Sequence, residues 1–144
     1  LEMSVKEVHE KLVSNMKKWQ KLEDATILQT SGIISKTDNT VIRIIMEIIR
    51  SDSLNHHRVQ SLISETIERG ITVNPDELME IWGLIERHSE MEKNTVRLGA
   101  ECLDILNPKD NVVAQYLLSY LMTDEQKHDE LLENLEKIKK GMYP

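Results

Sequence analysis

Apolar residues recur every three or four positions along four long stretches of the chain. This spacing places them on one face of an α-helix and predicts four amphipathic helices, at about residues 3–34, 39–69, 75–106 and 110–140. The breaks between the stretches are short, so consecutive helices are expected to run antiparallel. The pattern therefore predicts an all-α, up-and-down four-helix bundle that forms a single domain over residues 1–144.

Residue types at the breaks favour these boundaries. Asp38 and Asp110 are suitable N-cap residues for the second and fourth helices, and Asn74-Pro75 is typical of a helix start. The second predicted helix is expected to end at Gly70, the third at Asn107-Pro108 and the fourth at Gly141.

The two halves of the chain repeat each other with an offset of 72 residues (124 − 52). At this offset Asp52 corresponds to Asp124 and His56 to His128. A fused pair of helical hairpins would place like residues at symmetry-related positions. The segment from Gly70 to Asn74 is then the link between hairpins, and we do not expect it to be a domain boundary.

Composition narrows the class of protein. Hydrophobic residues make up 40% and charged residues 30% of the 144 residues, which is typical of packed helices. The net charge of -7 argues against nucleic acid or an anionic membrane as a partner, since both attract basic surfaces. The single cysteine, Cys102, excludes an internal disulfide. Without a signal-peptide pattern or an apolar run of about 20 residues, a cytoplasmic location is expected.

Ionisable residues interrupt the apolar stripes of the first and third predicted helices. The first stripe consists of Leu12, Met16, Trp19, Glu23 and Thr26. The third consists of Ile81, Ile85, His88, Glu92, Thr95, Gly99, Cys102 and Leu106. Residues on such a stripe point toward the core, where an acid must be paired, protonated or hydrated. Glu23 and Glu92, each followed three residues later by threonine, are therefore candidate functional residues.

The second and fourth predicted helices carry a related pattern. Glu125 and His128 form a Glu-x-x-His pair on one face, a spacing that allows both side chains to bind one ion. The repeat keeps Asp52 and His56, but Ser53 stands where the corresponding glutamate would be. A neutral hydroxyl is a poor replacement for a carboxylate, so this half of the pattern is incomplete.

The chain resembles the ferritin-like superfamily, and more closely its small rubrerythrin-related members. The residues that carry the resemblance are Lys21–Ile27, Asp52–His56, Ile85–His88 with Glu92, and Asp124–His128. The resemblance implies two metals, with Glu23 and Glu92 as single-helix ligands and Glu125 with His128 as a complete pair. His56 would be what remains of a second Glu-x-x-His pair, on the second predicted helix. Asp52 or His88 could replace the missing glutamate of that pair.

The resemblance also implies iron or manganese, with zinc as a further choice, and activity in oxidation, peroxide removal or iron handling. A redox activity would require a separate electron-donor protein, because the chain has no rubredoxin-like cysteine cluster. The alternative is a non-catalytic structural or interaction module without a cofactor, such as a homodimer. Ser53 favours that alternative, and so would pairing of the buried acids with Arg43, Arg87 or Arg97.

Overall fold

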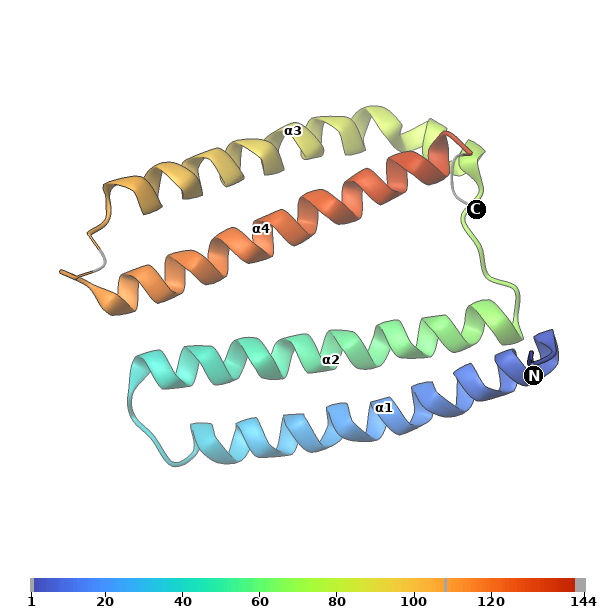
Figure 1. The fold of residues 1–144 in the computed structure, drawn as a ribbon, viewed down its shortest axis with the longest axis horizontal. Helices are drawn as coiled ribbons and strands as arrows, with labels where there is room; N and C mark the ends of the chain where they lie inside the picture. The colour runs from blue at the N-terminus through green and yellow to red at the C-terminus, as the bar shows by residue number, and fades with distance from the viewer. Residues whose placement is uncertain (1, 108, 142–144) are drawn as a thin grey trace. The chain divides into compact units, whose positions relative to one another are not determined.

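A computed structural model of the chain describes residues 2–107 and 109–141 (Figure 1). It contains four helices, α1 (Val5–Ile34), α2 (Thr40–Glu68), α3 (Pro75–Ile105) and α4 (Val112–Lys139). There is no strand among the described residues. The all-α prediction is confirmed, and each helix end lies within two residues of its predicted position.

The helices form two antiparallel hairpins, which Figure 1 shows as α1 with α2 and α3 with α4. The chain divides into two compact units after Thr72, and each unit contains one hairpin. Four helices paired in this way are consistent with a four-helix bundle and confirm the repeated hairpins of the prediction. The assignment of both hairpins to a single domain stays a prediction. No helix of the described residues is long and apolar enough to cross a membrane.

The contact between α1 and α2 is unusually polar. Its buried side chains include Met16, Glu23 and Thr30 on α1, at intervals of seven residues, and Ser53 and Gln60 on α2. This spacing is that of a heptad seam between two helices. The seam differs from the predicted stripe of the first helix, because Trp19 is 51% exposed and Leu12 is also exposed. The predicted stripe steps by four and three residues and therefore contains both apolar positions of a heptad. Met16 and Glu23 occupy the position that is buried against α2, whereas Leu12 and Trp19 occupy the other position and are exposed within the described hairpin.

The contact between α3 and α4 includes the buried residues Leu78 and Glu92. A Cβ atom at Gly99 would lie 3.2 Å from Sδ of Met122, so the glycine allows α4 to approach closely. Ile81, which was predicted on the inward stripe of this helix, is instead exposed. Leu78 and Glu92 lie two heptads apart (92 − 78 = 14) and share one heptad position, whereas Ile81 occupies the other apolar position of the heptad.

The N-caps of α2 and α4 are Asn39 and Asn111, so the predicted Asp38 and Asp110 are each wrong by one residue. The side chain of each asparagine accepts hydrogen bonds from backbone N–H groups in the first turn of its helix. Each aspartate lies one residue farther from that turn. Because Asp-Asn occurs at both places and both residue types cap helices, the sequence does not distinguish them.

The remaining helix ends follow the expected chemistry. Asn74 caps α3 and forms a capping box with Glu77, and Pro75 occupies the first turn. Gly70 and Gly141 both have φ of 66°, the left-handed conformation that commonly follows a helix. Pro108, the predicted end of the third helix, lies outside the described residues.

Candidate metal centre

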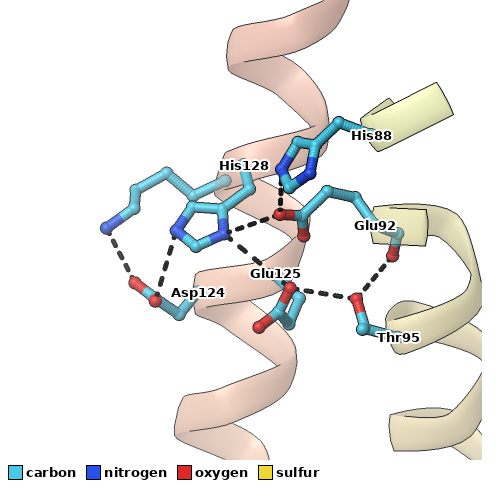
Figure 2. A network of polar contacts seen from close by, with 7 residues as sticks. His88, Glu92, Thr95, Asp124, Glu125 and His128 are labelled. Carbon is cyan, nitrogen blue, oxygen red and sulfur yellow. Dashed lines mark hydrogen bonds and ion pairs between the residues drawn. The ribbon is translucent and has the colours of Figure 1, made fainter. Parts of the chain in front are cut away.

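Two carboxylates and an imidazole converge between α3 and α4 (Figure 2). One ligand atom from each of Glu92, Glu125 and His128 lies within 4.8 Å of the other two. Glu92 comes from α3, whereas Glu125 and His128 lie three residues apart on α4 and therefore project from the same side of that helix. Glu92 is only 9% exposed, so its charge is withdrawn from bulk water.

The imidazole rings lie beside the carboxylates. The Nδ1 atom of His128 is 3.6 Å from Oε1 of Glu92 and 3.7 Å from Oε2 of Glu125. The Nε2 atom of His88 is 3.0 Å from the same Oε1 atom of Glu92. The other oxygen, Oε2 of Glu92, is buried and has no hydrogen-bond partner among the described residues. A buried acceptor without a partner is costly, so this oxygen is available to a cation.

The surroundings of Glu92 favour its charged form. A hydrogen bond with the Glu125 side chain holds the pKa of Glu92 below its ordinary value of 4.5. Burial opposes this effect, and the charges of His128 and His88 reinforce it.

Thr95 connects the two helices at this level. Its Oγ1 atom lies 2.6 Å from the backbone oxygen of Glu92 and 3.0 Å from Oε2 of Glu125. The hydroxyl can therefore hold the Glu125 carboxylate from α3, as Figure 2 shows. The sequence pattern predicted that Thr95 lies on the inward stripe, but it did not predict the contact of Thr95 with Glu125. The signal that could have revealed it is the one-turn spacing from Glu92.

Asp124 lies on the other side of the His128 ring. Its Oδ2 atom is 3.5 Å from Nε2 of His128, and its Oδ1 atom is 2.7 Å from Nζ of Lys127. A proton on Nε2 that faces Asp124 leaves the lone pair of Nδ1 directed toward Glu92 and Glu125. Asp124 therefore orients the imidazole. The four-residue spacing from His128 is the sequence signal for this contact.

The first hairpin holds a smaller version of this arrangement. The Oε2 atom of Glu23 lies 3.4 Å from Nδ1 of His56, and Glu23 is 8% exposed. Ser53, three residues before His56 on α2, is also buried. No group of three potential metal ligands is present among the described residues of this hairpin.

No protein-family model, curated protein or solved structure matches this chain. The resemblance to ferritin-like proteins thus rests on the residues quoted from the sequence, and function has to be argued from the geometry.

Of the seven predicted site residues, the structure brings Glu92, Glu125 and His128 together and places His88 against Glu92. Glu23 and His56 form a separate pair on the first hairpin. Asp52 forms no ion pair with another described residue. Neither buried glutamate is paired with an arginine among the described residues. Arg43 donates instead to backbone oxygens of Ile34 and Thr37, and Arg87 to that of Gly83.

Proposed function

We propose that the protein is a ferritin-like metal protein that binds a transition-metal ion through Glu92, Glu125 and His128. The convergence of their ligand atoms within 4.8 Å of one another is the observation that carries this proposal. Two carboxylates and one imidazole are a common donor set for divalent first-row metals. The lone buried oxygen of Glu92 and the ordered side chains around the ligands support it further.

Iron or manganese is the metal that the ferritin-like resemblance favours, and zinc is compatible with the same donors. Three protein ligands leave coordination positions for water or a substrate. With iron or manganese, such a site would supply redox chemistry for oxidation, peroxide removal or iron handling. The electron donor for such an activity would be a separate protein.

The test is the metal content of protein purified without chelator and without metal-affinity capture. We expect bound metal in the parent protein and its loss in both Glu92→Ala and His128→Ala. His9→Ala is the matched control, because His9 is exposed at the start of α1 and should not affect metal content. Ligand at a hundred times its dissociation constant should stabilise the parent by about 2.7 kcal/mol. No metal after reconstitution with iron, manganese and zinc, together with an unchanged melting temperature, would contradict the proposal.

The alternative is a structural or interaction module that has lost the complete site. Ser53 is the observation that favours it, because this buried side chain replaces a ligand in one of the two repeats. In that case the histidines beside Glu23 and Glu92 would be the permanent partners of these acids. The metal measurement above separates the two functions.

A further inference from the structure

The two hairpins repeat one acid–imidazole contact. Nδ1 of His56 lies 3.4 Å from Glu23, and Nδ1 of His128 lies 3.6 Å from Glu92. Both glutamates are buried to nearly the same extent, at 8% and 9% exposure. The first hairpin therefore keeps the acid and the imidazole in the relationship that they have at the candidate metal centre.

The hairpins differ at the position three residues before each histidine. Glu125 occupies it on α4, and Ser53 occupies it on α2 with 5% exposure. The threonines differ as well. Both hydroxyls lie within hydrogen-bond distance of a backbone oxygen in their own helix, and only that of Thr95 also lies within reach of a carboxylate on the other helix, Oε2 of Glu125. The missing carboxylate is thus the main difference between the two arrangements.

The missing carboxylate changes the number of ligands that can converge on one ion. In the second hairpin, one ligand atom from each of Glu92, Glu125 and His128 lies within 4.8 Å of the other two. In the first hairpin, Glu23 and His56 supply one carboxylate and one imidazole, and no third potential ligand joins them among the described residues. Oε2 of Glu23 is buried without a hydrogen-bond partner among those residues, as Oε2 of Glu92 is, so the two hairpins differ in ligand number and not in the burial of the acid.

We propose that the chain holds one transition-metal ion, on the second hairpin alone, and that Ser53 is what prevents a second metal site on the first hairpin. This inference rests on the proposed function of Glu92, Glu125 and His128. A carboxylate at position 53 would complete a donor set with Glu23 and His56, equivalent to the set on α3 and α4. The ligand of this latent site belongs to the same class, a divalent first-row metal ion.

The test is a titration of the full chain, stripped of metal with a chelator, with Mn²⁺ and separately with Zn²⁺. Metal bound per chain is measured by elemental analysis after gel filtration. We expect one ion for the parent and two for Ser53→Glu. Ser53→Gln, which has nearly the same shape without the charge, is the matched control and should stay at one. Adding Glu92→Gln to Ser53→Glu should reduce two ions to one.

The outcomes separate this inference from the proposed function. No ion in the parent defeats the proposed function itself. One ion in the parent that is lost in Glu92→Gln, together with one ion in Ser53→Glu, leaves the proposed function standing and overturns the inference. Two ions in the parent also overturn it.

A second variant keeps the test decisive if the buried carboxylate of Ser53→Glu prevents folding. Glu23→Gln in the parent background removes the acid of the first hairpin without adding charge. Under our proposal this variant retains one ion, with an affinity within about threefold of the parent's. A tenfold or greater loss of affinity would mean that Glu23 binds the same ion, and the proposed restriction to the second hairpin would be wrong.

Discussion

The hydroxyl of Thr95 lies 3.0 Å from Oε2 of Glu125, so a carboxylate on α4 is held by a side chain on α3. Under the proposed function, this contact would orient a metal ligand, because it would restrict the carboxylate without itself binding the ion.

Thr95→Val should weaken metal binding about tenfold, because it keeps the shape of the side chain and removes the hydroxyl. Competition against a fluorescent chelator would measure the change in affinity. Thr95→Ser retains the hydroxyl and should restore most of the affinity. Equal affinities for the parent and Thr95→Val would show that this hydrogen bond does not contribute to binding.

Asp124→Asn should also lower the metal affinity, by about 10- to 100-fold, because its carboxylate lies 3.5 Å from Nε2 of His128 and is placed to orient that ring. Asp52 occupies the repeated position on the first hairpin, so Asp52→Asn is the matched control and should leave affinity unchanged. Calorimetric titration with one metal would compare the two variants. A similar loss in both would mean that neither aspartate acts through its neighbouring histidine.

The depressed pKa of Glu92 predicts a dependence of stability on pH in the metal-free protein. The contribution is complete well above the ordinary pKa of 4.5 and is lost as pH falls through the lower folded-state pKa, because the unfolded chain takes up the proton first. The free energy of unfolding of the parent, relative to that of Glu92→Gln, should therefore fall as the pH is lowered from about pH 6 to pH 3. Urea unfolding in the presence of chelator would measure it. Glu90→Gln, at an exposed neighbouring position, should show a much smaller change.

Two glycines should respond to alanine in opposite directions. Gly83 lies inside α3 with open space around its Cβ position, so Gly83→Ala should stabilise the protein by about 0.5–1 kcal/mol. Gly70 has φ of 66°, and Gly70→Ala should destabilise the protein by about 1–2 kcal/mol. Denaturant unfolding of both variants would test this. A stabilised Gly70→Ala would contradict the left-handed conformation at the end of α2.

The helices could be predicted because long periodic stretches, Gly70 and Asn74-Pro75 all indicate the same boundaries. The seam between α1 and α2 could not be predicted as well. Gln60 and Ser53 are buried there while Trp19 is exposed within its hairpin, the reverse of what their hydrophobicity suggests. Gln20 donates to the hydroxyl of Ser61 and to the backbone oxygen of His57, whereas Oε1 of Gln60 is buried without a hydrogen-bond partner among the described residues. Such partners lie far away in the sequence and leave no local signal.

For the candidate site, helical spacing was sufficient to place Glu125 and His128 on one side of α4, and the inward stripe was sufficient for Glu92. Asp124 was predicted only as the counterpart of Asp52, although its four-residue spacing from His128 already indicated the contact with Nε2. Side chains one residue apart on a helix point about 100° away from each other, so Asp124 and Glu125 lie near different nitrogens of His128. The four-residue spacing predicts that His88 lies against Glu92. It does not predict which of the two carboxylate oxygens of Glu92 the imidazole contacts.

Every residue from Gly70 to Asn74, between α2 and α3, is exposed. Exposed links of this kind are the places where proteases cut most readily. All three ligands of the candidate centre lie on the C-terminal side of this segment, so a cut there would divide the polypeptide and leave the centre's residues on one fragment.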